Sequence, residues 1–396
     1  MTEAHRSTPA GKPRARALGI PFDGTPGRWN AITDVPGVEV GHVTLIEGEG
    51  VRTGITAIHP RGRADPSDPC VAGFHSQNGQ GEMTGVHWVQ ESGTFSGPIA
   101  LTSTHAIGTA HNAIVQWTAR NHPQVADGWL LPVVAETWDG YVHDINGGHL
   151  TEELAVEAFE GAVSGPLEEG SVGGGTGMVC YGYKGGFGTA SRTVAYAGDD
   201  YTVGVAVQAN FGARRELTIA GVPLGRALAD DNPFERFFAM PAAGSVLVIV
   251  ATDAPLLPDQ CRALARRVTV GLARTGSSGD HFSGDLFLAC SVANAGAITP
   301  EDDALRSTAP RRYDELRFIP WGYQDPLNQA VAQATEEAVV NAIVANEEMV
   351  GYAGRRVPGF PRERARELLA PVLAARADAL GELDAQADAA DAKAAL

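Results

Sequence analysis

The chain has 396 residues, of which 44% are hydrophobic and 48 are glycine, so it can bury a substantial core in one large domain or in two or three smaller ones. A formal net charge of −17 argues against a nucleic-acid backbone or an anionic membrane as a partner, because both need clustered Lys and Arg. Lysine occurs only as Lys12, Lys184 and Lys393, which removes most Schiff-base and Ser-Lys chemistry.

The cysteines and the N-terminus indicate a compartment. Cys70, Cys180, Cys261 and Cys290 are widely spaced, without a C-x-x-C pair, so we expect buried free thiols. Residues 1–16 lack the apolar segment of a secretory signal, and no later window holds 18 uninterrupted apolar residues. The sequence therefore predicts a soluble cytoplasmic protein with no membrane partner.

Composition along the chain predicts one domain with two flanking segments. Residues 1–17 are rich in Arg, Pro and Ser and are expected to form a disordered arm. No internal repeat or composition break divides residues 18–374, which we expect to form a single catalytic domain. Residues 375–396, dominated by Ala and Asp, are expected to be a tail.

Short strands and one helix are predicted in the first third of the chain. Residues 38–43 alternate as half-buried strands do, and residues 70–75 form another strand candidate. The glycine-rich segment Ser76–Glu82 that follows suits either a turn or the wall of a pocket. Residues 106–120 are predicted to be a helix, and residues 130–135 a buried strand.

That buried strand ends in Glu136-Thr137-Trp138-Asp139-Gly140-Tyr141. A carboxylate, an indole and a phenol within six residues suit the binding of a cationic amine. The alternative is a pair of solvated acids beside two aromatic side chains at the edge of the core.

In the middle of the chain, residues 154–162 have the periodicity of an amphipathic helix. The glycine-rich segment 171–178 matches neither a P-loop nor G-x-G-x-x-G, and we expect it to approach a reactive centre closely or to form ordinary turns. Residues 193–197 and 202–209 are predicted to pair as a hairpin through residues 198–200. Residues 212–244 are expected to be irregular and exposed, as a cleavable loop should be.

The last part of the chain predicts alternating strands and helices. A buried strand begins at Ser245, and residues 258–273 form a helix with Cys261, Leu264, Val268 and Leu272 on one face. Residues 286–291 are a further strand. A long helix is expected to start at Asp325-Pro326 and to stop at Gly351.

Ser245 carries the most distinctive chemistry. The small residues Pro241-Ala242-Ala243-Gly244 lead into it, and a cut before it would leave a hydroxyl nucleophile and a free α-amine on one residue. An α-amine has an unperturbed pKa of roughly 7.7 to 8.0, so it can serve as the base near neutral pH. The alternative is that Gly244-Ser245 is an ordinary turn before a strand.

Other catalytic signatures are missing from the sequence. The eleven histidines form no H-E-x-x-H or H-x-H pattern, and His105 and His111 are too far apart around a helix to bind the same metal ion. No metal site is therefore expected. The G-x-S-x-G elbow and S-x-x-K are also absent.

Several blocks resemble the DmpA-type family of self-processing aminopeptidases, which includes L-aminopeptidase/D-Ala esterase-amidases and β-peptidyl aminopeptidases. These blocks are Glu136–Tyr141, Gly173–Met178, Val207–Leu217 and Gly244–Leu256, and the similarity runs from about Leu18 to Arg356. The resemblance implies an α/β fold, the four-layer αββα sandwich called the DOM fold, which is similar to N-terminal-nucleophile hydrolases. It also implies cleavage into an α chain of residues 1–244 and a β chain of residues 245–396.

The resemblance assigns roles to individual residues. It makes Ser245 the nucleophile, Asn210 a donor to the oxyanion and Tyr141 a hydrogen-bond donor or proton shuttle at the scissile group. Ser283 and Asp285 match a hydroxyl-plus-acid pair near the new α-amine, where some members carry Glu in place of Asp. Glu136, with Trp138 beside it, is our choice for binding the amino group of the substrate.

The implied activity is the release of N-terminal residues from small peptides, amides or esters through an acyl-enzyme on Ser245, with no cofactor. Family members typically assemble as tetramers of αβ units. The alternatives are an acyltransferase of the ornithine-acetyltransferase type, an oligoamide hydrolase, or an uncleaved binding scaffold. The first two related groups use threonine where this chain has Ser245.

Overall fold

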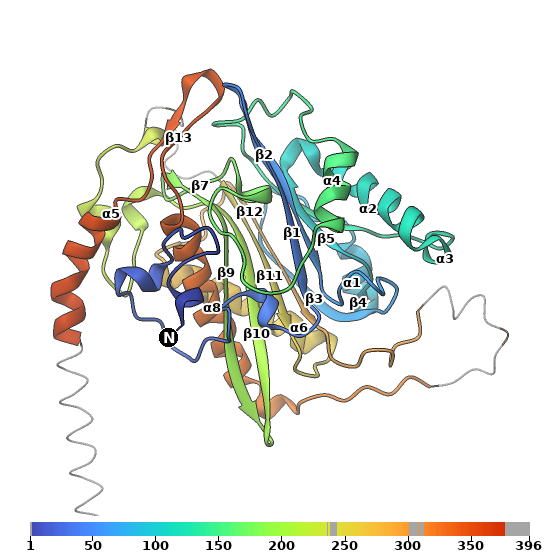
Figure 1. The fold of residues 1–396 in the computed structure, drawn as a ribbon. Coiled ribbons are helices and arrows are strands. Elements are labelled where there is room, and N and C mark those ends of the chain that lie inside the picture. Colours follow the sequence, from blue (N-terminus) through green and yellow to red (C-terminus); the bar gives the residue numbers. More distant parts are fainter. Residues whose placement is uncertain (1, 236, 238–243, 301–307, 309–312, 377–396) are drawn as a thin grey trace, which may run out of the picture.

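Two β-sheets lie face to face at the centre of the fold, and helices cover both outer faces (Figure 1). The computed structural model describes residues 2–235, 237, 244–300, 308 and 313–376. One sheet has the strand order β4-β3-β12-β11-β10-β9 and the other the order β1-β2-β5-β6. The expected four-layer αββα sandwich is confirmed.

The strands of the larger sheet are β3 (Cys70–Gly79), β4 (Thr94–Phe95), β9 (Gly186–Tyr196), β10 (Asp199–Asn210), β11 (Gly244–Thr252) and β12 (Ser283–Ser291). The smaller sheet contains β1 (Glu39–Glu47), β2 (Val51–His59), β5 (Ile99–Ser103) and β6 (Val133–Thr137). Short hairpins are formed by β7 (Val179–Cys180) with β8 (Tyr183–Lys184) and by β13 (Met349–Val350) with β14 (Arg356–Val357).

The helices are α1 (Val86–Ser92), α2 (Ile107–Asn121), α3 (Pro123–Ala126), α4 (Glu152–Glu160), α5 (Leu224–Ala227), α6 (Pro258–Arg274) and α8 (Asp325–Val344). A further helical segment covers residues 362–376. Helices α2 and α4 pack on the smaller sheet, and α6 and α8 pack on the larger one. Within the described ranges, none of the helices combines the length and apolar character that a membrane span requires.

Strand β11 shows how the sequence builds these layers. Successive side chains of a strand point to opposite faces. Leu247 and Ile249 accordingly join the core between the two sheets, while Val246, Val248 and Val250 join the core beneath α6 and α8. An unbroken apolar run is therefore required at a central strand that is covered on both sides.

The predicted helix at residues 258–273 is confirmed as α6. Its four predicted apolar positions, Cys261, Leu264, Val268 and Leu272, are all buried. The predicted helix from Asp325 is confirmed as α8, but it ends at Val344 and not at Gly351. Asn346 explains the early end, because its side-chain Nδ2 donates to the Ala342 carbonyl at 2.6 Å.

The prediction of a disordered arm is wrong for residues 2–17. Arg14 is buried, and its guanidinium donates to both carboxylate oxygens of Glu169, at 2.7 and 3.2 Å. Arg16 likewise makes a bidentate ion pair with Glu337, at 2.6 and 2.7 Å. The prediction counted only apolar side chains, whereas these residues are ordered by buried carboxylates that need cations.

The prediction of an irregular, exposed segment at residues 212–244 is wrong for its first half. Leu217, Ile219 and Leu224 belong to the core. Arg214 is buried, donates to the Tyr181 carbonyl at 2.8 Å and lies 3.4 Å from the centre of the Tyr183 ring. Residues 236 and 238–243 lie outside the described residues, as does most of the predicted tail.

Glu337 is expected to be a principal stabilising residue, because it is fully buried and accepts from Arg16, from Arg192 at 2.8 Å and from Asn30 at 2.7 Å. Glu337→Gln leaves two buried guanidinium groups short of a counter-charge and should cost about 3–5 kcal/mol of unfolding free energy. Urea unfolding measures this. The control Glu367→Gln breaks only the exposed pair with Arg364 and should cost less than about 1 kcal/mol. Equal losses in the two variants would contradict the assignment.

Candidate active site

Three neighbouring strands of the larger sheet bring five of the predicted site residues together: Asn210, Gly244, Ser245, Ser283 and Asp285. Strand β11 is antiparallel to β10 and parallel to β12, and Ser245 is the register partner of both Asn210 and Gly284. Gly244 is paired in the same ladder with Ser283. The end of β10 and the starts of β11 and β12 therefore meet at one edge, although their residues are far apart in sequence.

Ser245 is buried, with 5% of its surface exposed. Its hydroxyl Oγ lies 2.8 Å from the Gly244 carbonyl oxygen and accepts a hydrogen bond from the Gly284 N–H at 3.3 Å. The Gly244 N–H donates to the Phe282 carbonyl at 3.1 Å. Main-chain groups of β12 and of Phe282, the residue before it, thus bond to the Ser245 hydroxyl and to the Gly244 N–H.

Gly244 cannot be replaced here without moving a neighbouring strand. A Cβ atom at this position would lie 2.1 Å from the Asn210 main-chain oxygen. The absence of a side chain therefore lets β10 and β11 approach each other at the point where Ser245 faces Asn210.

The side chain of Asn210 is bonded at both of its polar atoms. Its Oδ1 accepts from the Val179 N–H at 2.8 Å, and its Nδ2 donates to the Trp138 carbonyl at 2.9 Å. An amide Nδ2 carries two hydrogens, so one remains for a further acceptor. This geometry suits a donor to negative charge that develops beside Ser245.

Ser283 and Asp285 form the expected hydroxyl-plus-acid pair, because the Ser283 hydroxyl donates to Asp285 Oδ1. The other carboxylate oxygen accepts from Asn78 at 3.0 Å and Gln77 at 3.3 Å. Burial raises the pKa of Asp285, and the hydrogen bonds from Ser283 and Asn78 oppose that shift. A short Asp side chain thus reaches Ser283 directly.

Asn78 and Gln77 were not predicted as site residues. The sequence-based interpretation left Ser76–Glu82 open between a turn and a pocket wall, whereas β3 continues to Gly79 and carries both amides to Asp285. The signal that was available is the change from an apolar strand to consecutive polar residues, which places hydrogen-bonding side chains at a strand end.

Glu136 reaches this region from the smaller sheet, at the end of β6. It is 5% exposed, accepts from the Glu82 N–H at 3.0 Å and receives a hydrogen bond from the Thr104 hydroxyl. A Cβ on Gly81 would lie 3.4 Å from Glu136 Oε1 and 3.0 Å from the Gly284 Cα. Gly81 therefore lies close to both the Glu136 carboxylate and β12, the strand that pairs with Ser245. Burial raises the pKa of Glu136.

Tyr141 lies in an aromatic cluster. Its ring meets Phe234 and Phe237 edge-on, with centroids 4.9 Å apart in each pair, and the Arg355 guanidinium lies 5.7 Å from its centroid. Burial raises the pKa of Tyr141. Among the described residues, no hydrogen bond joins Tyr141 to Ser245. Trp138 contributes its carbonyl to Asn210 and packs beside this cluster.

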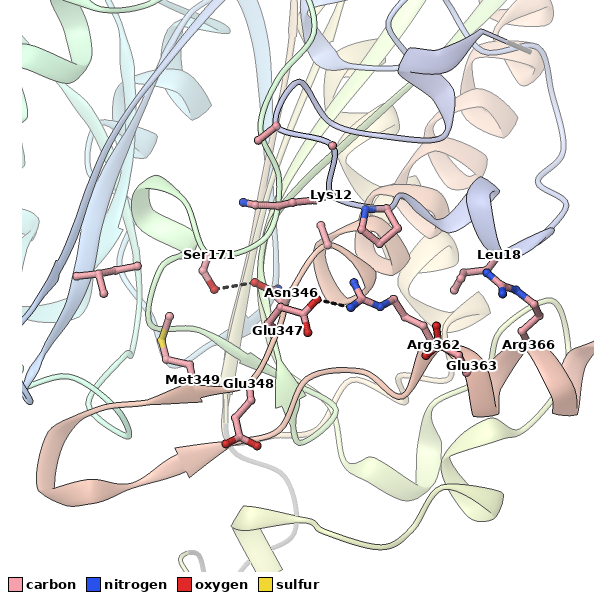
Figure 2. A pocket seen from close by; sticks show the side chains of 15 residues that line it. Lys12, Leu18, Ser171, Asn346, Glu347, Glu348, Met349, Arg362, Glu363 and Arg366 are labelled. Atoms are coloured by element: carbon pink, nitrogen blue, oxygen red, sulfur yellow. Dashed lines mark hydrogen bonds and ion pairs between the residues drawn. The ribbon is translucent and has the colours of Figure 1, made fainter.

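A separate cavity and a possible metal site were the other candidates. A cavity of about 600 Å³ lies between the N-terminal segment, the residues around Glu347 and the helical segment 362–376. Figure 2 shows the side chains that line it. None of the predicted site residues lines it. Within the described part of the chain, no group of three or more His, Cys, Asp or Glu is arranged to hold a metal ion.

The proteins to which this chain is similar are named as aminopeptidases. The β-peptidyl aminopeptidase BapA of Sphingosinicella microcystinivorans is 45% identical over 376 residues, covering 90% of this chain and 92% of the relative. The L-aminopeptidase D-Ala-esterase/amidase of Ochrobactrum anthropi has a solved structure, described as a prototype for the serine aminopeptidases and a new variant among the Ntn hydrolase fold. It matches with 43% identity and a TM-score of 0.85, covering 91% of this chain and 99% of that one.

A Burkholderia sp. β-aminopeptidase structure matches with 43% identity and a TM-score of 0.83, again covering 91% of this chain and 99% of the other. The fold and these relatives define a hydrolase, an aminopeptidase with this variant of the N-terminal-nucleophile hydrolase fold. The model of peptidase family S58 matches residues 30–357, and the chain belongs to that family. The resemblance inferred from the sequence is confirmed.

The buried carboxyl group of Glu136 is expected to make stability depend on pH. Its pKa is raised above the ordinary 4.5, so the folded state binds this proton more tightly than the unfolded chain does. The resulting stability is present at low pH and is lost as the pH rises through the raised pKa. Glu136→Gln carries no charge and should therefore be more stable than the unchanged protein at high pH and equally stable at low pH.

Urea midpoints at about pH 4 and about pH 8 measure this dependence. The exposed-side-chain control Glu91→Gln should show no such difference. A Glu136→Gln variant that is less stable than the unchanged protein at the higher pH would show that its hydrogen bonds outweigh the cost of burying the charge.

Proposed function

We propose that the chain cuts itself between Gly244 and Ser245 and that the mature enzyme removes N-terminal residues from small peptides, amides or esters. The observation that carries this proposal is the register of β10, β11 and β12. It places the Ser245 hydroxyl next to the Gly244 carbonyl and opposite Asn210, with Ser283 in the adjacent strand.

In the cleavage step, Ser245 Oγ attacks the carbonyl carbon of Gly244. An ester to Oγ replaces the amide bond, and the released Ser245 nitrogen takes up a proton as an amine. Water then hydrolyses the ester, which leaves residues 1–244 and 245–396 as two chains. Two contacts of Ser245 Oγ support this step: it donates to the Gly244 carbonyl at 2.8 Å and accepts from the Gly284 N–H of β12 at 3.3 Å, so the hydroxyl lies beside the group that it attacks.

In the mature enzyme, the α-amine of Ser245 accepts the proton of its own hydroxyl as Oγ attacks the substrate carbonyl. Asn210 donates to the oxygen that becomes negative. The protonated α-amine then returns the proton to the departing amine or alcohol, and water releases the acyl group from Oγ. Ser283 and Asp285 hold and stabilise the α-amine while it carries the proton, and Tyr141 assists at the scissile group.

Glu136 is proposed to bind the free amino group of the substrate, with Trp138 beside it. The support is its burial, because a buried carboxylate is stabilised by an ammonium partner. The relatives named as aminopeptidases favour hydrolysis over acyl transfer to an amine. A homo-oligomer, such as a tetramer of αβ units, is part of the proposal. So is a cytoplasmic location, which four buried free thiols support.

Ser245→Ala is expected to abolish both processing and hydrolysis, because it removes the atom that forms both esters. Denaturing electrophoresis should show one chain for the variant and two for the unchanged protein, and N-terminal sequencing of the smaller chain should read Ser-Val-Leu-Val. The control Ser96→Ala, at an exposed serine, should process normally. Activity from a single uncut chain would overturn the mechanism.

A set of p-nitroanilides tests the choice of substrate. Those of L-Ala, D-Ala and β-Ala present a free amine to Glu136, and N-acetyl-L-Ala does not, so the acetylated compound should be hydrolysed at least about 100-fold more slowly in kcat/KM. Glu136→Gln should raise KM for the free amines. Equal rates with the acetylated compound would remove Glu136 from this role.

A further inference from the structure

Lys184 lies completely buried at the end of β8 and is held by main-chain oxygens. Its Nζ donates to the carbonyls of Met178 and Gly185 at 2.8 Å each and to that of Gly175 at 3.5 Å. No carboxylate of the described residues bonds to it. Burial lowers the pKa of its ammonium to about 7. Burying such a group is costly, so its position calls for an explanation.

The bond to Met178 connects Lys184 with the active site through one peptide group. The Met178 carbonyl and the Val179 N–H belong to the same planar peptide. Lys184 holds the carbonyl, and the N–H donates to Asn210 Oδ1 at 2.8 Å. The Gly185 N–H also donates to the Met178 carbonyl, at 2.9 Å, so the lysine and the main chain hold this peptide jointly.

A second peptide group holds the other end of Asn210. The Trp138 carbonyl that accepts from Asn210 Nδ2 belongs to the peptide between Trp138 and Asp139. The Asp139 carboxyl group is fully buried and accepts from the hydroxyls of Thr53 and Ser103 at 2.7 Å each. Burial raises its pKa to about 7. The residue is therefore pinned to two strands of the smaller sheet.

Gly177, the residue before Met178, lies close to Asp139. A Cβ on Gly177 would lie 2.7 Å from the Asp139 Cβ. On the far side, Asn346, which Figure 2 shows in the cavity wall, donates to the carbonyls of Lys184 at 3.1 Å and Gly185 at 2.8 Å. Little space is left in which the Lys184 main chain could shift.

We propose that Lys184 and Asp139 are positioning residues that fix the Asn210 amide from opposite ends, so that its remaining Nδ2 hydrogen points to the oxyanion beside Ser245. This rests on the proposed function of Asn210. It gives a role in the reaction to two buried ionisable groups that make no contact with the reacting atoms.

A double-mutant cycle on processed enzyme tests the proposal, with kcat and KM measured on β-alanine p-nitroanilide. Asn210→Ala removes the donor and should lower kcat about 100-fold or more. Lys184→Met misplaces the donor and should lower kcat roughly 10-fold to 100-fold with KM little changed. The double variant should be no slower than Asn210→Ala alone, because the lysine acts only through that amide.

The control Lys12→Met changes a partly exposed lysine and should leave kcat unchanged. If the losses from Lys184→Met and Asn210→Ala multiply, or if Lys184→Met alters KM and not kcat, the positioning role is wrong and the lysine only supports the fold. Full kcat in Asn210→Ala would instead overturn the proposed function of Asn210 itself. Asp139→Asn, which preserves size, should give the same non-additive pattern and carries the test if Lys184→Met does not fold.

Discussion

The site depends on how closely the main chains of three strands approach one another. Asn210, Ser245 and Gly284 are register partners across β10, β11 and β12, and this alignment brings the proposed donor, the proposed nucleophile and the adjacent strand together at one edge. The approach is possible because Gly244 and Gly284 lack side chains: a Cβ on either would lie 2.5 Å or less from a main-chain oxygen of a neighbouring segment. The position of Ser245 is thus set by backbone geometry.

Buried ionisable side chains have different partners near the candidate site and away from it. Away from the site, Glu337 and Glu169 are neutralised by arginines in direct ion pairs. Near the site, Glu136, Asp139 and Lys184 are held by hydroxyls, main-chain N–H groups or carbonyls. These partners orient the three groups but supply no counter-charge, and burial shifts the pKa of each group toward its neutral form.

The local sequence pattern predicted much of the fold, because periodicity reports burial. The apolar run from Ser245 and the spacing from Cys261 to Leu272 correctly indicated β11 and α6. The pattern failed where polar side chains create order. Arg14 and Arg214 were assigned to disordered or exposed segments, since composition does not reveal that each binds a carboxylate or main-chain carbonyls that are distant in sequence.

The sequence by itself determined the family and the candidate nucleophile, because motifs read in succession carry both, and the layered architecture followed from the resemblance to that family. It could not show that Asn78 and Gln77 bind Asp285. Nor could it show that Lys184 and Asp139 are each connected to Asn210 through one peptide group. Those relations join residues that are distant in sequence and depend on strand register and on the direction of single peptide groups. Only the tertiary structure decides these, since the same residues in another register would not meet.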